Sequence, residues 1–523
     1  MSTIREATDK DVEQIRDIFV QVYGKDYPFK GFYDTEWLKK AVYDDGTLFL
    51  VMEMDNKVIA SASMMLTSGG LDDMIGEAGR LVATTDKRYR GKGLYTDLII
   101  ALLERTRDRV LFLMGEARTP HRGSQKILEE LKWIPAGFEP MKYLLGKRRE
   151  SIVFYIQTQG MAKELRRNNP HIISEVSVLA QTVLKNSKFP VDVIVEDETE
   201  GYPTNEEFKI EHLTKQKGIS SLLRIERGRV TNKEVFGNFS LSHGYFRIAT
   251  QSSSYLVAKE GKAVLGAVGF SYDPIDKKIR IFELIEFDDA VKGALLTALD
   301  RIASKEYDVD YIEVDVSAYS PKIQRTFERL GFIPVAYCPS MVFDKVERLD
   351  IIRMAKIKCS YDIGELHLLE PGQKMKEIVE KCLDDRIFGI EITKGTKNTE
   401  LFRDIPDGDL YHLASISNIC EYKTGTTLVK KGDAAKELFI LLSGEVKVKT
   451  QSKDVVLKKG SVFGEMALVE RSPRTADVVM SKDGKVIKID LLRLERLMAK
   501  HPRIGCAVSM NLARSLSSKL RKT

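Results

Sequence analysis

The chain has 523 residues, which is too long for one hydrophobic core, and a typical domain size of about 150 residues indicates several domains. Hydrophobic residues make up 43% and charged residues 30%, and no apolar run approaches the roughly 18 residues of a membrane-spanning helix. The 82 basic and 76 acidic residues nearly balance, so we expect a soluble protein with no membrane or nucleic acid partner. The five cysteines are scattered and the first residues lack a signal-peptide pattern, so we expect a cytoplasmic location and no metal site.

Residues 1–157 alternate between strand and helix patterns. Apolar alternation with period two predicts strands, and a period of 3.6 residues after an acidic first turn predicts helices. In chain order we expect a strand at 4–7, a helix at 8–19, a hairpin of strands 48–54 and 58–66, a strand at 78–83 and a helix at 95–105. A strand at 110–114, an amphipathic helix with Ile127, Leu128 and Leu131, and a hairpin within 138–157 follow. This order predicts an α/β (α+β) domain with a mixed sheet.

A basic, glycine-rich loop, RYRGKGLY at residues 88–95, follows the strand at 78–83. Gly91 and Gly93 allow the backbone to approach an anion closely, and the N–H groups at the start of the next helix point toward the same place. Arg88, Arg90 and Lys92 add positive charge. The loop therefore predicts a pyrophosphate-binding site.

In this position the loop resembles motif A of the GNAT superfamily of acyl-CoA-dependent N-acyltransferases. The resemblance implies that the loop holds the pyrophosphate of coenzyme A, with acetyl-CoA as co-substrate. One register starts at Arg90 and places Tyr95 where the family has Gly or Ala, and the other starts at Arg88. The cofactor-binding residues implied are Leu81, Val82, Ala83, Arg88, Arg90, Gly91, Lys92, Gly93, Leu94 and Tyr95.

Acetyl transfer to an amine requires a base, because a lysine amine has a pKa of about 10.4 and must lose a proton before it attacks a thioester. The candidate bases are Glu77, just before the predicted strand at 78–83, and Glu116, just past the predicted strand at 110–114. Tyr143, on the last hairpin, and Tyr95 are candidates for protonating the leaving thiolate. Backbone N–H groups near residues 81–83 are candidates for holding the oxyanion.

The chain also contains an internal repeat. QKILEELKWIPAGFEP at residues 125–140 matches QRTFERLGFIPVAYCP at residues 324–339, which lies 199 residues later. Two copies of one fold are therefore expected. We place the first copy at 1–157, a helical connector at 158–189 and a second, GNAT-like copy at 190–347.

The second copy lacks the glycine-rich loop. At the corresponding place, in IRIFELIEFDDAVKGALLTALDRI at residues 279–302, stand Asp288 and Asp289. Carboxylates at a helix start satisfy the helix dipole and repel pyrophosphate. We therefore expect the second copy to be degenerate and to bind no acyl-CoA.

A predicted helical linker at 348–398 leads to a C-terminal domain at 399–523, where Gly425, Gly432 and Gly444 mark turns between short strands. There, FGEMALVERSPRTADV places a helical turn after Gly464 and an arginine, Arg474, nine residues after Glu465. Together these groups suit a cyclic phosphate and a ribose hydroxyl. The segment resembles the phosphate-binding cassette of the cyclic nucleotide-binding domain family, which implies a β-roll. The binding residues implied are Phe463, Gly464, Glu465, Met466, Ala467, Arg474 and Thr475.

The two resemblances predict an N-acetyltransferase regulated by a cyclic nucleotide, similar to the cyclic-nucleotide-regulated protein lysine acetyltransferases of bacteria. The expected acceptor is a protein lysine, and the expected effector is cAMP in preference to cGMP. One alternative is acetylation of a small amine, such as an aminoglycoside, polyamine or amino acid. Another is a non-catalytic sensor or scaffold. The sequence leaves the oligomeric state open.

Overall fold

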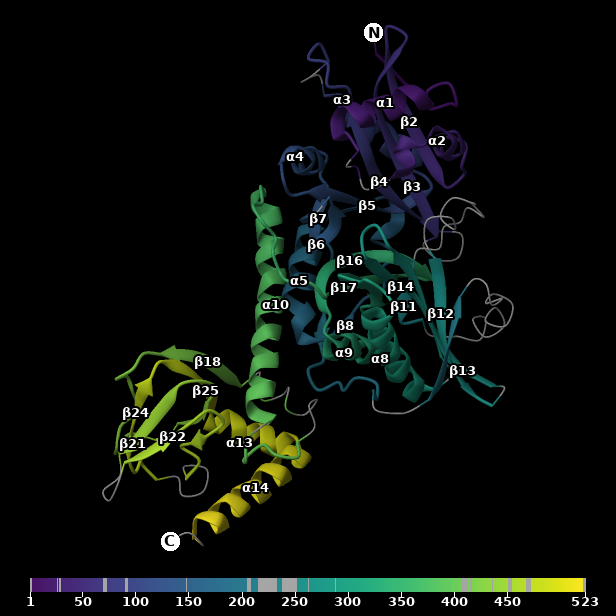
Figure 1. Ribbon diagram of the computed structural model, residues 1–523. Helices are drawn as coiled ribbons and strands as arrows, with labels where there is room; N and C mark the ends of the chain where they lie inside the picture. The colour runs from purple at the N-terminus through teal and green to yellow at the C-terminus, as the bar shows by residue number, and fades with distance from the viewer. Residues whose placement is uncertain are drawn as a thin grey trace. The chain divides into compact units, whose positions relative to one another are not determined.

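The chain folds into two compact units, Met1–Cys382 and Leu383–Thr523. The computed structural model (Figure 1) describes residues 2–25, 27, 30–68, 73–89, 93–146, 148–204, 208–214, 233–237, 252–261, 263–286, 288–397, 399–405, 410, 413, 416–434, 436–449, 454–466 and 472–520. Within these residues, no helix combines the length and the apolar character that crossing a membrane requires.

The first copy of the repeat forms one half of a large mixed sheet. Its elements are β1 (Thr3–Glu6), α1 (Val12–Tyr23), the 3-10 helix η1 (Lys30–Tyr33), α2 (Thr35–Ala41), β2 (Thr47–Met54), β3 (Lys57–Ser68), β4 (Met74–Ala83), α3 (Leu94–Thr106), β5 (Val110–Arg118), α4 (Gly123–Glu130), β6 (Ile134–Leu145) and β7 (Arg148–Thr158). Strands β1 to β4 are antiparallel neighbours, β5 is parallel to β4, and β7 lies between β5 and β6.

Most predicted elements of this copy are present, but the first helix begins later than predicted. Residues 8–11 precede α1 because the carboxylate of Asp11 forms an ion pair with Arg5, at 2.7 Å, and accepts the backbone N–H of Thr8. The acidic residues that suggested a helix start therefore close a turn. Helix α2 was not predicted.

The connector between the copies is only partly helical. It contains the 3-10 helix η2 (Gly160–Ala162), strand β8 (His171–Ile172), helix α5 (Ser174–Asn186) and strand β9 (Ile194–Val195). In the connector predicted to be helical at 158–189, the α-helix therefore begins only at Ser174.

The second copy repeats the order of the first and completes the sheet. Its elements are β10 (Lys209–Thr214), β11 (Val235–Phe236), β12 (Ser252–Glu260), β13 (Ala263–Asp273), β14 (Lys278–Glu286), α8 (Asp289–Lys305), β15 (Tyr311–Ser317), α9 (Pro321–Leu330), β16 (Ile333–Asp344) and β17 (Glu347–Ile357). As in the first copy, β15 is parallel to β14, and β17 lies between β15 and β16.

The two copies meet at an approximate twofold axis. Strand β6 pairs with β16 through Gly137 and Ala336, which are equivalent residues of the repeat, and antiparallel pairing of equivalent residues is what a local twofold produces. Arg149 and Arg348 are also equivalent. Arg149 Nε donates to the carbonyl of Met141 at 2.7 Å, and Arg348 Nε donates to that of Ser340 at 2.8 Å. The sequence repeat is therefore a structural repeat, and its assignment to the GNAT superfamily stays a prediction.

The C-terminal unit contains two four-stranded sheets followed by two helices. Its elements are β18 (Ser417–Tyr422), β19 (Thr427–Val429), β20 (Glu437–Leu441), β21 (Glu445–Lys449), β22 (Val455–Leu457), β23 (Val462–Phe463), β24 (Asp477–Lys482), β25 (Gly484–Asp490), α13 (Leu491–Lys500) and α14 (Pro502–Leu520). The sheet orders are β18-β25-β20-β23 and β19-β24-β21-β22. Gly425, Gly432 and Gly444 have φ angles of 85°, 91° and 84°, so the glycine turns expected from the sequence are confirmed.

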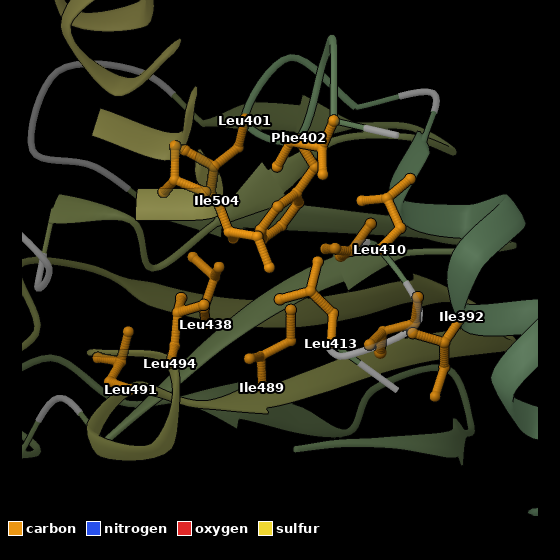
Figure 2. Packing of buried hydrophobic residues seen from close by; sticks show 14 residues of the cluster. Ile392, Leu401, Phe402, Leu410, Leu413, Leu438, Ile489, Leu491, Leu494 and Ile504 are labelled. Carbon is orange, nitrogen blue, oxygen red and sulfur yellow. The ribbon is translucent and has the colours of Figure 1, made fainter. Parts of the chain in front are cut away.

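Helix α10 (Glu370–Lys397) contributes residues to both units. Its C-terminal part enters the core of the C-terminal unit, where Ile392 belongs to one buried cluster with Phe402, Leu438, Ile489 and Ile504. Figure 2 shows these side chains converging from the helices and the sheet. The end of α10 is therefore fixed by hydrophobic packing to the sheet of the C-terminal unit.

Candidate functional site

A cavity of about 650 Å³ lies within the C-terminal unit. Its lining includes every described residue of the predicted phosphate-binding segment, namely Phe463, Gly464, Glu465, Met466, Arg474 and Thr475. The remaining predicted residue, Ala467, lies outside the described residues. The structure therefore brings together residues from β23 and from the segment that precedes β24.

Gly464 allows the backbone to bring the two sides of the site close together. Its φ angle is 84°, a conformation that residues with a side chain rarely adopt. A Cβ atom at this position would lie 2.6 Å from Nη1 of Arg474 and 3.1 Å from the carbonyl oxygen of Glu437. Glycine is therefore required both for the turn and for the approach of the arginine.

Arg474 is held at the site by backbone carbonyls. Its Nη1 donates to Gly464 O at 3.3 Å, its Nη2 donates to Glu437 O, and its guanidinium lies 5.6 Å from the ring centroid of Phe439. Burial lowers the pKa of Arg474 from its ordinary value, with opposition from the carboxylates of Glu437, Asp433 and Glu465. A planar guanidinium in this position can donate two parallel hydrogen bonds to a phosphate.

The apolar walls of the cavity were not predicted from the sequence. Val429, Val448, Leu457 and Val478 line it from four strands of one sheet. The alternation Glu445-Val446-Lys447-Val448 predicts a strand with one apolar face, but it gives no sign that this face borders a ligand. Further lining residues come from outside the strands, namely Glu400, Leu401, Leu512 and Ser515.

The second candidate site lies at the carboxyl ends of β4 and β5 in the first copy. The parallel strands are paired from Met74–Val110 to Ala78–Gly115, and this pairing does not continue in the rest of these fully described strands. The final residues of β4, including Val82 and Ala83, pair with β3. At their carboxyl ends, β4 and β5 therefore no longer pair with each other. Open α/β sheets commonly bind ligands where neighbouring strands separate in this way.

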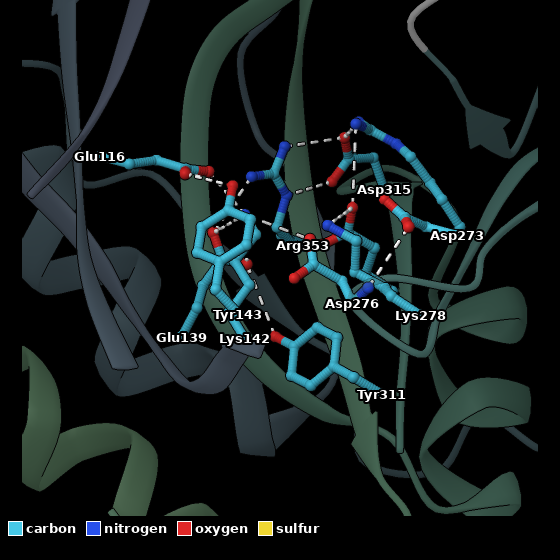
Figure 3. A network of polar contacts seen from close by, with 12 residues as sticks. Glu116, Glu139, Lys142, Tyr143, Asp273, Asp276, Lys278, Tyr311, Asp315 and Arg353 are labelled. Carbon is cyan, nitrogen blue, oxygen red and sulfur yellow. Dashed lines mark hydrogen bonds and ion pairs between the residues drawn. The ribbon is translucent and has the colours of Figure 1, made fainter. Parts of the chain in front are cut away.

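Glu77 and Glu116 lie on either side of this divergence. Glu77 accepts from Arg80 Nη1 at 2.5 Å, and Arg80 has a φ angle of 52° at an irregularity of β4. Glu116 accepts from Lys142 Nζ at 2.6 Å and from the hydroxyl of Tyr143 at 2.5 Å, as Figure 3 shows. The three predicted catalytic residues, Glu77, Glu116 and Tyr143, are therefore gathered toward the carboxyl ends of β4 and β5.

Glu116 and Tyr143 differ in protonation state. Burial alone would raise the pKa of Glu116, but the Lys142 ammonium and the Tyr143 hydroxyl lower it below its ordinary value. Burial and the charges of Glu116 and Glu77 raise the pKa of Tyr143 well above its ordinary value. Near neutral pH, Glu116 is therefore an anion and Tyr143 keeps its proton.

The second copy contributes to this group of charges. Lys142 also contacts Glu139 at 3.0 Å, and Arg353 contacts Glu139 at 3.2 Å (Figure 3). Lys142 lies 3.8 Å from Glu313 of the second copy. The contacts of Lys142 with Glu313 and of Arg353 with Glu139 join residues far apart in the chain, so the sequence does not predict them. Lys142 is thus held between Glu116 and the buried boundary of the two copies.

The glycine-rich loop is only partly described. Arg90, Gly91 and Lys92 lie outside the described residues, so neither of the two registers is tested. Gly93 precedes α3 with a φ angle of 72°, and the N–H groups at the start of the helix are therefore preceded by a left-handed turn. Arg88 is exposed and forms an ion pair with Asp86 at 2.6 Å.

The other predicted residues of this site have different degrees of burial. Val82, Ala83 and Leu94 are buried, whereas Leu81 and Tyr95 are partly exposed.

The equivalent end of the second copy is occupied by its own chain. Pairing of β14 with β15 ends at Ile281–Val314, and β11 then pairs with β15 through Val235–Val316 and Phe236–Asp315. The structure also places Asp288 as the cap of α8, with its carboxylate accepting the N–H of Ala290 at 3.0 Å. Strand β11 therefore gives a second reason, beyond the predicted carboxylates, why this copy differs from the first.

Comparison with known proteins gives a match in the C-terminal unit. Residues 419–501 match the family model described as cyclic nucleotide-binding domain. Pycsar effector protein XpPycTIR of Xanthomonas perforans is 30% identical over 109 residues, which are 20% of this chain and 36% of that protein. A cAMP-dependent protein kinase regulatory subunit of Blumeria graminis is 38% identical over 81 residues, which are 15% of this chain and 21% of that protein.

A solved structure of a putative cyclic nucleotide-binding protein from Geobacter metallireducens GS-15 is 25% identical, covers 23% of this chain and 91% of its own, and has a TM-score of 0.22. The present chain spans about a third or less of the length of the Xanthomonas perforans and Blumeria graminis relatives. The family match covers the β-roll, the glycine turns and the segment that carries Gly464 and Arg474. The C-terminal part of this chain is a cyclic nucleotide-binding domain.

Proposed function

We propose that this protein is an acyl-CoA-dependent N-acetyltransferase whose activity is regulated by cyclic nucleotide, with a protein lysine amine as acceptor. The observation that carries the proposal is the divergence of β4 and β5 in the first copy, with Glu77, Glu116 and Tyr143 gathered beside it. Gly93, at the start of α3, belongs to the loop that resembles the pyrophosphate-binding motif.

The reaction forms a bond between the amine nitrogen and the acyl carbon and breaks the bond from that carbon to sulfur. Acetyl-CoA supplies the acyl group. Glu116 accepts the hydroxyl of Tyr143, the proposed proton donor, so we assign to Glu116 the orientation of Tyr143. We assign the removal of the amine proton to the other predicted carboxylate, Glu77, which is paired with Arg80. Tyr143, which keeps its proton, would donate to the leaving thiolate. Backbone N–H groups near residues 81–83 would hold the oxyanion.

For the effector we favour cAMP. One relative is named as cAMP-dependent and another, from Toxoplasma gondii, as cGMP-dependent, so the names do not decide between the two bases. Thr475 lines the cavity directly after Arg474 and has the small hydroxyl expected to accommodate either base. Calorimetric titration of the full chain with each nucleotide would separate them, and tighter binding of cGMP would reverse the assignment.

The catalytic proposal is tested by acetyl-CoA binding and by acetyl transfer to lysine peptides. Gly93→Val should abolish acetyl-CoA binding, because a β-branched residue strains the left-handed turn and projects a side chain at the expected anion site. Gly261→Val is the matched control, since Gly261 has a φ angle of 58° in a turn of the second copy. Equal binding by both variants would reject the loop as the cofactor site.

The same assay distinguishes the alternatives. Transfer to polyamines, aminoglycosides or amino acids without transfer to peptides would indicate a small-amine acetyltransferase. Cyclic nucleotide binding by a protein that shows neither acetyl-CoA binding nor transfer would indicate a non-catalytic sensor.

A further inference from the structure

The residues that directly precede α10 are bound to the first copy beside its candidate site. The side chain of Gln125, on α4, is completely buried. Its Nε2 donates to the carbonyl of His367 at 2.9 Å, and its Oε1 accepts the N–H of Leu369 at 2.9 Å. The N–H of His367 donates to the carbonyl of Thr119 at 2.8 Å. Residues 367–369, which we call the strap, are therefore held by three hydrogen bonds.

The strap is attached to the end of the strand that carries Glu116. Thr119 follows β5 directly, three residues after Glu116, and Gln125 Nε2 also lies 3.5 Å from the carbonyl of Arg118. A change in the position of the strap would therefore act on the end of β5. This is the part of the strand that is unpaired with β4.

The same strap leads without interruption into the cyclic nucleotide-binding unit. Helix α10 starts at Glu370, one residue after Leu369, and Figure 1 shows its first turn beside α4. In the N-terminal unit it buries Met375 and Val379, and in the C-terminal unit it supplies Ile392 to the hydrophobic core. Secondary elements such as helices can carry energetic coupling between distant sites.

The repeat provides an internal comparison. Gln324, the residue equivalent to Gln125, is also completely buried and makes the same kind of contacts. Its Nε2 donates to His171 O at 3.0 Å, and its Oε1 accepts the N–H of Ile173 at 3.1 Å. The helix that follows, α5, ends at Asn186 and leads into the second copy. Each glutamine thus binds the backbone of a distant segment through its amide group. Of these two segments, the one that Gln125 binds continues into the nucleotide-binding unit.

We propose that the strap couples cyclic nucleotide binding to the candidate site of the first copy, through the hydrogen bonds of Gln125 and Thr119. The part that concerns acetyl-CoA rests on the proposed function, whereas the response of the strap to nucleotide does not. Coupling of this kind is reciprocal, so cAMP should change acetyl-CoA affinity and acetyl-CoA should change cAMP affinity by the same factor. Typical factors are about 5- to 150-fold.

The first experiment uses the unmodified full chain. Amide hydrogen exchange would be measured for peptides that contain His367 and Leu369, with and without saturating cAMP. We expect cAMP to change exchange at these two amides, while the amide of Ile173, bound by Gln324, stays unchanged. Unchanged exchange at His367 and Leu369 would overturn the proposal whether or not the protein is an acetyltransferase.

The second experiment compares Gln125→Met with Gln324→Met in the full chain. Methionine has a similar length but forms no amide hydrogen bonds, so each variant loses the hydrogen bonds that its glutamine makes to the backbone of a distant segment. We expect Gln125→Met to bind cAMP and acetyl-CoA with a coupling factor near one, and Gln324→Met to keep the wild-type factor.

Equal loss of coupling in both variants would show a general loss of stability and overturn the proposal. Coupling that survives in folded Gln125→Met would also overturn it. If no form of the protein binds acetyl-CoA, the proposed function fails, and the exchange experiment still decides the role of the strap. That experiment also decides if Gln125→Met does not fold.

Discussion

Replacement of Arg474 by alanine should remove most of the affinity for cyclic nucleotide. The guanidinium lies between Gly464 O and Glu437 O at the edge of the cavity, where it can face a phosphate with two donors. A hydrogen bond to a charged group contributes about 1.5–3 kcal/mol. Two such bonds set an upper limit, and the partial exposure of Arg474 to solvent reduces it.

We therefore expect a loss of about 2–4 kcal/mol in binding free energy, which corresponds to roughly a 30- to 700-fold weaker Kd. Isothermal titration calorimetry with cAMP measures this loss. Arg474→Lys should fall between wild type and alanine, because lysine keeps the charge but loses the planar pair of donors. Arg493→Ala, at an exposed position of α13 outside the cavity lining, is the control for an arginine lost elsewhere in the same unit.

The unfolding midpoint of each variant must be measured as well, because Arg474 also donates to two backbone carbonyls of the β-roll. A folded Arg474→Ala protein that binds cAMP within threefold of wild type would refute the assignment of the phosphate site to this arginine.

Three further predictions concern the N-terminal unit. Gly137→Ala should lower the unfolding free energy, measured by urea denaturation, by about 1–3 kcal/mol or more, because its Cβ would lie 2.2 Å from Val335 O where the copies meet. Gly79→Ala is the control and should change the unfolding free energy little, because its Cβ would have no neighbouring atom within 4 Å. Lys142→Met should cost up to about 3–5 kcal/mol of unfolding free energy, because Glu116 loses its ammonium partner while Glu139 keeps only Arg353. Unchanged stability of this variant would contradict a charged pair of Lys142 and Glu116. Burial raises the pKa of Glu286 to about 7 from an ordinary value of 4.5. The contribution of the Glu286 carboxyl group to stability is thus complete below pH 4.5 and is lost as the pH rises toward 7. Glu286→Gln should therefore make the unfolding free energy less dependent on pH over this interval. An unchanged pH profile would contradict the shift.

The sequence alone determined the features that depend on neighbouring residues. Gly464 and the glycines of the β-roll turns were identified because a positive φ angle is a local property that only glycine adopts easily. The order of the strands and of helices α1, α3 and α4 in the first copy followed from apolar periodicity, which is likewise local. The repeat was visible because residues 125–140 and 324–339 keep similar side chains at the same spacing.

The start of the first helix shows where local signals fail. Asp9 and Asp11 in sequence suggested a capped first turn, but the tertiary structure gives the carboxylate of Asp11 to Arg5. The carboxylate of Asp11 accepts from Arg5 as well as from the backbone N–H of Thr8, and its contact with Arg5 depends on the position of β1 relative to α1.

Tertiary structure alone decided which distant residues meet at the sites. Lys142 lies between Glu116 and Glu313, and Gln125 binds Leu369 across 244 residues of sequence. Strand β11 pairs with β15 at a place that no periodicity marks. Each of these contacts depends on how the two copies pair at Gly137 and Ala336, or on where a later segment of the chain crosses an earlier one. Such long-range packing leaves no periodic pattern in the residues that neighbour the contact in sequence.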